Sequence, residues 1–390
     1  MKLSPKNLII TAALASLMAF AITRTSPTHF SGVVFAQSQN QQMSEVAFKN
    51  IQVLKGIPVD EFMGTMGLFS AALSVCCGDC HTGAGTAHPK WEDDPPRKLR
   101  ARQMVQMVNA INKTSFGGRQ VVTCWTCHRG AQTPSTTPPI DVIYSTPVFA
   151  PPDVLPAAPA TGAGTPPAAQ ILDTFVQALG SADATAKLTS YTAKGTSMLF
   201  GEVNADPVEI YAKAPDMLAT LVHQREGDLS RTFDGQNAWV MLPLTVVGEY
   251  PLNASMREGG KLDAELAFPW RIKGFFNNWK ASYPSSIDGK DVYVVQGTTG
   301  PNGLVATFYF DKSTGLLTRM VRYANSAVGR VPTQIDYSDY RPVAGVKMPF
   351  KWTYGWVSGR EEYVISGYQP NAPVDAAKFA KPVQRAAAAQ

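Results

Sequence analysis

The stretch "VCCGDCHTGA" at positions 75–84 holds three cysteines and a histidine within six positions. Part of it reads Cys-x-x-Cys-His, and the same pattern returns in "CWTCH" further along the chain. A repeat of sulfur and imidazole ligands at fixed spacing predicts a bound metal or metal cofactor. The residues of the two copies are Cys77, Cys80 and His81, and Cys124, Cys127 and His128.

Cys-x-x-Cys-His is the attachment motif of c-type haem. Cysteines three residues apart lie on one side of a helical turn, so both sulfurs can reach the vinyl groups along one porphyrin edge. The histidine that follows is then placed to bind the iron. Two copies predict two covalently attached c-type haems, with His81 and His128 as the proximal iron ligands. A redox-active cysteine pair or a shared zinc site would leave both histidines without a role.

The first motif contains one cysteine more than it needs. Counting back from His81 selects Cys80 and Cys77 for attachment, which leaves Cys76 as the extra thiol. Attachment through Cys76 in a Cys-x-x-x-Cys-His arrangement is the alternative. The ordinary spacing of the second motif favours Cys77.

Each iron needs a further ligand on its distal side, and methionine is the natural candidate because a thioether favours ferrous iron. Met63 and Met66 precede the first motif, and Met104 and Met107 precede the second. Residues three apart share a helix face, but only one of each pair can bind an iron. His88 is an alternative to Met66, and a solvated loop histidine is the competing interpretation.

Helical patterns surround the motifs. We expect a short helix from Ser44 as N-cap to Gly56, a second after Asp60 as cap, and a third over residues 93–113 with Asp94 as cap, ended by "SFGG". Each of the later two carries Met-x-x-Met and is followed by Cys-x-x-Cys-His.

Charged and aromatic residues near the motifs have two interpretations each. The basic run either pairs haem propionates or guides an acidic redox partner, with a solvated helix face as the alternative. Two tryptophans are expected to pack against porphyrin. The residues concerned are Arg97, Lys98, Arg100 and Arg102, and Trp91 and Trp125.

These segments resemble the cytochrome c subunit of photosynthetic reaction centres over roughly residues 45–135. That family repeats a Met-bearing helix, a turn and Cys-x-x-Cys-His, giving His/Met-ligated haems that re-reduce an oxidised pigment pair. The resemblance implies Met66, four residues after Phe62, and Met104 as distal ligands, with Met63 and Met107 as alternates. The chain departs from the family in having two motifs, where a typical member carries four haems, and in its long β-rich region.

The N-terminus predicts export. Lys2 and Lys6 precede the apolar run from Leu8 to Ile22, and Ala36 is a plausible cleavage position, so residues 1–36 are either a signal peptide or an N-terminal anchor. We therefore expect the protein in the periplasm, free or anchored to the outer face of the inner membrane. All five cysteines lie between positions 76 and 127. An odd number of cysteines confined to one region does not indicate disulfides that stabilise the whole chain.

We expect a multidomain fold: an α-helical dihaem cytochrome c domain followed by an α+β domain with a curved antiparallel sheet, a half-barrel. The boundaries are residues 37–132 for the dihaem domain, 133–168 for a Pro/Ala-rich linker, 169–383 for the β-rich domain and 384–390 for a tail. A segment of this composition buries too little apolar surface to offset the conformational entropy that folding would cost, so we expect it to remain extended. The β-rich domain begins with the helical pattern "AQILDTFVQALG" and continues in alternating strands with Gly-punctuated turns.

The β-rich domain loosely resembles the periplasmic lipoprotein-carrier (LolA/LolB-like) proteins. The stretches that carry the resemblance are "FDGQNAWVM", "FYFDKSTGLLTRMVRY" and "YSDYRPVAGVKMPF". That family binds acyl chains in an apolar cavity, which implies a lipid or a quinone as ligand here. A docking or spacer domain is the alternative.

The favoured function is electron transfer by two haems, not enzyme catalysis. Partners are then redox proteins such as a membrane reaction centre or a respiratory complex, and a formal net charge of only +5 predicts no nucleic acid partner. A dihaem peroxidase-like enzyme, and a lipid- or quinone-binding protein with an accessory haem domain, are the alternatives. The sequence does not determine whether the electron transfer serves photosynthesis.

Overall fold

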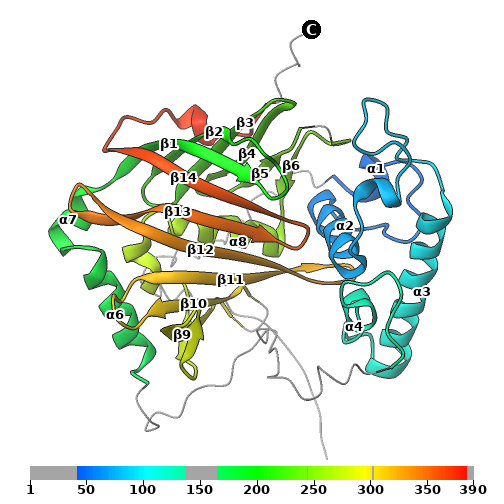
Figure 1. Ribbon diagram of the computed structural model, residues 1–390, viewed down its shortest axis with the longest axis horizontal. Helices are drawn as coiled ribbons and strands as arrows, with labels where there is room; N and C mark the ends of the chain where they lie inside the picture. The colour runs from blue at the N-terminus through cyan, green and yellow to red at the C-terminus, as the bar shows by residue number, and fades with distance from the viewer. Residues whose placement is uncertain (1–41, 138–164, 244, 301–302, 384–390) are drawn as a thin grey trace, which may run out of the picture. The chain divides into compact units, whose positions relative to one another are not determined.

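A computed structural model describes residues 42–137, 165–243, 245–300 and 303–383 (Figure 1). All of the described residues belong to one compact unit, which spans residues 40–390. The predicted leader, the predicted tail and residues 138–164 of the predicted linker lie outside the described residues. Within the described ranges, none of the helices combines the length and the apolar character that crossing a membrane requires.

The N-terminal region is helical, as predicted. Two long helices, α2 and α3, are each followed by a Cys-x-x-Cys-His turn, and α3 ends where Gly117 adopts φ 61°. That conformation suits glycine, so the "SFGG" stop is confirmed. The elements are α1 (Ser44–Ala47), α2 (Val59–Leu73), the 3₁₀ turn η1 (Cys77–Asp79), α3 (Pro96–Phe116) and α4 (Cys124–His128).

The predicted first helix is much shorter than expected. Helix α1 ends at Ala47, and Asn50 has φ 57°, a left-handed conformation that turns the chain. Ser44 is not the N-cap: it is fully buried, and its hydroxyl donates a hydrogen bond of 2.5 Å to the carbonyl of Leu54. That bond requires residues 44–54 to fold back on themselves, which a continuous helix cannot do.

The two predicted aspartate caps are also wrong. Pro58 and Pro95 occupy the N-cap positions of α2 and α3. The carboxylate of Asp60 instead accepts the backbone N–H of Asn253 at 2.6 Å, and that of Asp94 accepts a hydrogen bond of 2.9 Å from the side chain of Asn50. Both aspartates serve tertiary contacts, which local sequence patterns do not reveal.

The C-terminal region contains one large antiparallel sheet with strand order β6-β5-β4-β3-β2-β1-β14-β13-β12-β11-β10-β9-β7, and β8 pairs with β9. The first and last strands pair in its middle, while β6 and β7 are its edges, so the sheet is not closed. The strands are β1 (Ser190–Leu199), β2 (Asp206–Lys213), β3 (Met217–Gln224), β4 (Gly227–Asp234), β5 (Ala238–Met241), β6 (Glu249–Leu252), β7 (Asn278–Ala281), β8 (Ser285–Ile287), β9 (Lys290–Thr298), β10 (Val305–Asp311), β11 (Leu317–Ser326), β12 (Gly329–Val343), β13 (Val346–Trp356) and β14 (Gly359–Pro370).

Helices pack on one face of this sheet. The buried residues Ile171, Leu172, Phe175 and Leu179 recur at helical spacing along α6, which confirms the predicted helix and gives it one apolar face. Phe175 meets Phe310 of β10 with ring centroids 5.0 Å apart. The remaining helical elements are α6 (Ala168–Leu179), α7 (Ala182–Lys187), α8 (Ala254–Glu265), η2 (Pro269–Gly274) and η3 (Ala376–Phe379).

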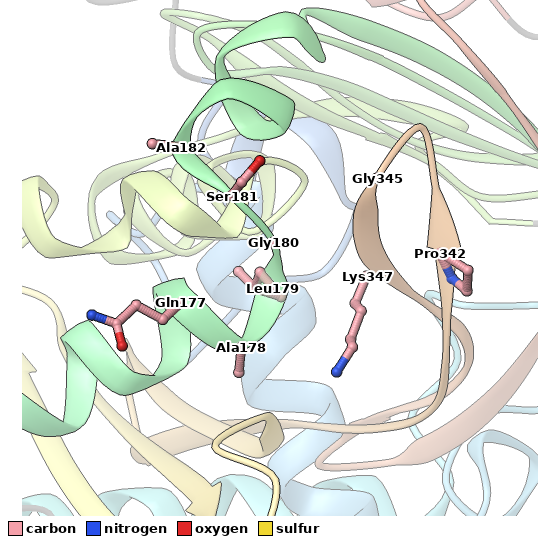
Figure 2. A pocket seen from close by; sticks show the side chains of 9 residues that line it. All are labelled: Gln177, Ala178, Leu179, Gly180, Ser181, Ala182, Pro342, Gly345 and Lys347. Atoms are coloured by element: carbon pink, nitrogen blue, oxygen red, sulfur yellow. The ribbon is translucent and has the colours of Figure 1, made fainter.

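A surface hollow of about 610 Å³ lies where the α6–α7 junction meets the turn between β12 and β13 (Figure 2). A Cβ on Gly180 would lie 2.6 Å from the carbonyl oxygen of Gly345, so the close approach requires glycine. Lys347 is the one ionisable side chain that lines the hollow. A single charge without a partner group does not make a catalytic site.

A buried ion pair crosses the inside of the curved sheet. Glu361 on β14 is 1% exposed, and its carboxylate accepts hydrogen bonds from Arg231 of β4 at 3.3 Å and from Ser197 at 2.5 Å. Strands β3, β2 and β1 lie between β4 and β14 in the sheet, so this contact shows how strongly the sheet curves. Burial raises the pKa of Glu361, but the charge of Arg231 and the hydrogen bonds outweigh it, and the net pKa is lowered.

We predict that Glu361→Gln lowers the free energy of unfolding at neutral pH by about 3 kcal/mol, because it leaves Arg231 buried without its counter-charge. A lowered carboxylate pKa gives stability that is complete above the ordinary value of about 4.3 and is lost as pH falls through the folded value. Denaturant titrations at several pH values should therefore show the difference between wild type and variant shrinking below about pH 4.

Glu362→Gln is the matched control. Glu362 is the next residue of β14 and pairs with Lys351 on the surface, with side chains 35% and 43% exposed. Its loss should cost less than about 1 kcal/mol. Equal effects of the two substitutions would contradict the role given to Glu361.

Candidate haem sites

The first motif follows α2 directly and forms a single turn. The backbone N–H of His81 donates to the carbonyl of Cys77 at 2.9 Å, which closes one helical turn over the motif. Cys77 is exposed and Cys80 is partly buried, and burial raises the pKa of the Cys80 thiol. Both are free thiols brought together by this turn, as haem attachment requires.

Cys76 has a different role from its neighbour. Its backbone N–H and its Sγ lie 2.9 Å and 3.3 Å from one carboxylate oxygen of Asp79, so Cys76 caps the turn. Asp79 also accepts a hydrogen bond of 2.8 Å from Arg97 of α3. The hydrogen bonds from Cys76, followed by the charge of Arg97, hold the pKa of Asp79 below its usual range. The thiol of Cys76 therefore has a structural partner within the turn.

The second motif is a short helix with reciprocal caps. The side chains of Thr123 and Thr126 each accept a hydrogen bond from the other's backbone N–H, at 3.3 Å and 3.0 Å. His128 Nδ1 lies 3.0 Å from the carbonyl oxygen of Ala131. A carbonyl only accepts, so Nδ1 carries the proton and Nε2 keeps the lone pair that binds a metal.

The pKa of His81 is lowered by its surroundings, but its buried Nδ1 has no hydrogen-bond partner among the described residues, so its tautomer is not fixed as that of His128 is. Burial lowers its pKa most, and the positive charge of Lys98 lowers it further, against an opposing hydrogen bond with the backbone of Trp91. The neutral imidazole is therefore favoured, and neutral imidazole is the metal ligand. The Trp91 ring lies at its edge, with centroids 5.3 Å apart. This contact connects Trp91 with the first motif, and packing against porphyrin remains a prediction.

The surroundings of the motifs suit a large apolar cofactor. Met107 of α3, Val121 before the second motif and Trp125 within it are 43%, 48% and 49% exposed. Large exposed apolar side chains mark surfaces that bind a partner or ligand, and a porphyrin would cover such groups. The thiols, the oriented imidazole and these side chains together fit covalently attached haem. Across the described ranges, no three His, Cys, Asp or Glu side chains gather as a group that could hold a metal ion.

The two candidate methionines of α2 have different surroundings. Met63 lines a cavity of about 450 Å³ between α2 and the inner face of the sheet, which we call the sheet cavity. Met66 instead packs in the small apolar cluster that contains Cys124 of the second motif. On α3, Met104 is partly buried, whereas Met107 is exposed. These surroundings separate the members of each pair, which sequence spacing alone does not.

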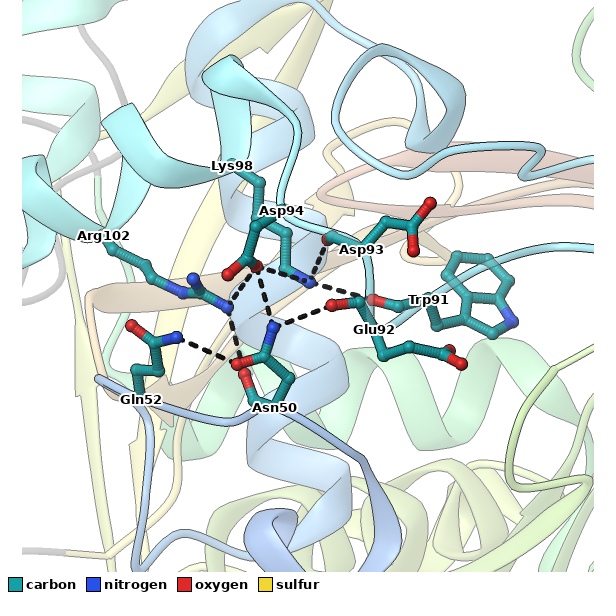
Figure 3. Close-up of polar contacts among 8 residues, drawn as sticks. All are labelled: Asn50, Gln52, Trp91, Glu92, Asp93, Asp94, Lys98 and Arg102. Carbon is teal, nitrogen blue, oxygen red and sulfur yellow. Dashed lines mark hydrogen bonds and ion pairs between the residues drawn. The ribbon is translucent and has the colours of Figure 1, made fainter.

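The basic run consists of Arg97, Lys98, Arg100 and Arg102, and most of its contacts are with the loop before α3 (Figure 3). Lys98 donates to the backbone carbonyls of Trp91 and Asp93 at 2.9 Å and 2.7 Å. Arg102 pairs with Asp94 at 2.8 Å, and its hydrogen bond is the largest cause of the lowered pKa of Asp94. With Arg97 bound to the first motif, three of the four basic residues have internal partners. Arg100 contacts no acidic group in the part of the chain that the structure describes.

A hairpin of the sheet domain completes the core around the second motif. Val328, in the turn between β11 and β12, is 2% exposed, and a Cβ on the following Gly329 would lie 2.7 Å from Leu68. Gln120 donates to the carbonyl of Ser326 in the same turn at 3.2 Å. The buried cluster consists of Leu54, Leu68, Ala72, Val105, Cys124 and Val328. Sequence reasoning missed this contact, although an apolar residue in a hairpin turn is a signal for it.

Residues 20–142 match the family model described as "Photosynthetic reaction centre cytochrome C subunit". The resemblance to this family is confirmed. The photosynthetic reaction centre cytochrome c subunit of Roseobacter denitrificans is 28% identical over 142 residues, which cover 35% of this chain and 38% of that protein. The subunit of Thermochromatium tepidum is 36% identical over 103 residues, covering 25% of this chain and 24% of that protein. The chain thus spans well under half the length of these cytochrome c subunits.

Solved structures similar to the chain include a LolA superfamily protein from Nitrosomonas europaea, with 14% identity, a TM-score of 0.37, and 56% of this chain and 99% of that chain covered. A putative outer membrane lipoprotein-sorting protein domain from Vibrio parahaemolyticus gives 10% identity, a TM-score of 0.36 and coverage of 53% and 97%. The predicted LolA-like resemblance is therefore found. At these scores it identifies no ligand.

We predict that Cys76→Ser leaves two covalent haems per chain, since serine keeps the turn-capping position next to Asp79. Cys77→Ser, one residue away, should lose one of the two attachment bonds of the first haem. Intact-mass measurement of protein exported in a haem-attaching host counts the haems in both variants, and the haemochrome absorption band, which shifts when a vinyl group is left unreacted, reports the lost bond of the Cys77 variant. Loss of a haem in the Cys76 variant would move the attachment to that residue.

Proposed function

We propose that the protein is an exported dihaem c-type cytochrome that carries electrons and is not an enzyme. The observation that carries this proposal is the pair of Cys-x-x-Cys-His turns, the second with its histidine ring fixed by the Ala131 carbonyl. Cys77 and Cys80 would hold one haem and Cys124 and Cys127 the other. His81 and His128 would be the proximal ligands. The match to the reaction centre cytochrome family supports electron transfer as the role.

Haem supplies one-electron exchange between ferric and ferrous iron. The chain itself supplies orientation and shielding. The Ala131 carbonyl fixes the tautomer of His128, burial keeps His81 neutral, and the apolar cluster around Cys124 excludes water. Hydrogen bonding to the ligands and exclusion of water are two factors by which a protein sets the reduction potential of a haem.

The proposed distal ligands are Met66 and Met104. The resemblance to the reaction centre cytochrome family supports this choice, and so does the position of Met63, which lines the sheet cavity. His88 lies exposed in a loop. Filling both distal positions with methionine favours a carrier over a peroxidase-like enzyme, which needs an open iron position.

The proposed partners are redox proteins, either a membrane reaction centre or a respiratory complex. The reaction centre is supported by the names of the related subunits. The proposed location is the periplasm, with residues 1–36 as a signal peptide or as an anchor on the outer face of the inner membrane. A second proposed activity, binding of a lipid or quinone in the sheet domain, is supported by the sheet cavity.

We predict that the purified protein takes up two electrons per chain in a redox titration and that both haems are low-spin in absorption spectra. Two filled distal positions are the physical reason. After the protein has been reduced and reoxidised, addition of peroxide should leave its absorption spectrum unchanged. A high-spin or peroxide-reactive haem would favour the enzyme alternative.

Methionine substitutions test the distal ligands. Met66→Ala and Met104→Ala should each remove the methionine-to-iron absorption of one haem and lower its reduction potential, because a thioether stabilises ferrous iron. Met63→Ala and Met107→Ala are the matched controls and should leave both haems unchanged. If a control loses the absorption and its partner does not, the assignment within that pair is reversed.

A further inference from the structure

The sheet cavity has walls from both regions of the chain. Helix α2 contributes Asp60, Met63, Gly64 and Gly67, which recur at helical spacing, and the inner face of the sheet contributes the remainder. Its volume of about 450 Å³ is in the range of small-molecule sites. A ligand there would contact the helix that precedes the first haem motif.

Aromatic rings form much of the cavity wall. Trp352 stacks on Tyr363 with centroids 5.2 Å apart and an interplanar angle of 13°. Tyr354 and Trp356 continue the row along β13, with centroids 6.2 Å apart. The guanidinium of Arg231 lies over Tyr354 and Trp356, 4.8 Å and 5.7 Å from the ring centroids, and covers part of this wall. A planar ring gains more than a flexible chain from the aromatic surface that remains, because ring pairs gain energy beyond the area that they bury.

The charged groups of the cavity neutralise one another. Arg231 is paired with Glu361 at 3.3 Å, and Arg322 is paired with Asp263 at 2.7 Å. An anionic headgroup would have to displace a carboxylate from one of these buried pairs, which is costly. Burial raises the pKa of Asp60, and its two carboxyl oxygens already accept hydrogen bonds from the backbone and side chain of Asn253. The cavity therefore suits an uncharged ligand.

Three tyrosines of the cavity wall have hydroxyls free for a ligand among the described residues, and two of them, unlike the partly buried Tyr337, are buried. Tyr191 and Tyr250 line the cavity, are 5% and 6% exposed, and form no side-chain hydrogen bond with any other residue that the structure describes. Tyr354, Tyr363 and other tyrosines nearby do have partners. A buried hydroxyl without a partner costs about 1–3 kcal/mol, so acceptor oxygens on a ligand would be favoured. The methylene groups of an acyl chain carry no oxygen, and the carboxylate of a fatty acid would meet the cost described for an anionic headgroup.

We propose that the sheet cavity binds an uncharged, planar ring compound with carbonyl oxygens, a quinone, whose ring lies against the aromatic wall and whose oxygens accept hydrogen bonds from Tyr191 and Tyr250. This inference rests on the proposed lipid or quinone binding and narrows it to one class. It uses residues of the sheet and α2, and it does not depend on the number or ligation of the haems.

The test is isothermal titration calorimetry of the full-length, haem-loaded protein with menadione as the quinone probe. We expect saturable binding of one molecule per chain. Tyr191→Phe and Tyr250→Phe should each weaken binding about three- to tenfold, the effect of one lost hydrogen bond. Tyr309→Phe is the matched control, because Tyr309 alternates with the core residues Phe308 and Phe310 on β10 and does not line the cavity.

Palmitate is the competing probe. Binding of palmitate with no binding of menadione would assign the cavity to acyl chains and overturn the proposal, as would failure of both to bind. Menadione binding that both Phe variants leave unchanged would overturn the role of the hydroxyls. Haem content and the redox titration, measured on the same samples, report separately on electron transfer, so failure of one proposal is distinguishable from failure of the other.

Discussion

The close contact between α2 and the sheet is the constraint on which the rest of the described structure depends. A Cβ on Gly64 would lie 3.0 Å from Met256, and one on Gly67 would lie 2.8 Å from Val357. Met256 belongs to α8 and Val357 to the turn between β13 and β14, and a side chain on either glycine would have to displace the ends of these side chains. The buried carboxylate of Asp60 fixes the same helix to Asn253. One face of α2 thus closes the sheet cavity, and its other side packs in the cluster around Cys124.

The sheet contributes to the helical region in return. The turn between β11 and β12 places Val328 beside Cys124, where it fills a core that the short helices α1 and α4 cannot complete by themselves. Small helical units bury too little apolar surface to be stable alone. Covalent cofactors and a neighbouring domain are two ways to add to such a core. Here the β-rich region is part of the environment of the second motif, beyond the docking or spacer role considered from sequence.

Much of the fold follows from local patterns. Helix α6 and the long helices α2 and α3 were predicted because their apolar residues recur at the period of a helix. The failures have one cause. Ser44, Asp60 and Asp94 look like helix caps, but their side chains bond to residues that are distant in sequence or across a fold-back, and tertiary partners override local propensity.

The sequence by itself determined the chemistry of the two motifs, because a Cys-x-x-Cys-His spacing fits within one turn and carries its own geometry. Spacing alone could not distinguish Met63 from Met66, which share a helix face in any helix, and only the family resemblance favoured Met66. Only the tertiary structure separated their surroundings, by placing a sheet cavity against one and an apolar cluster against the other. The same holds for the cavity, since Arg231 and Glu361 meet only because a sheet of many strands curves enough to bring β4 to β14.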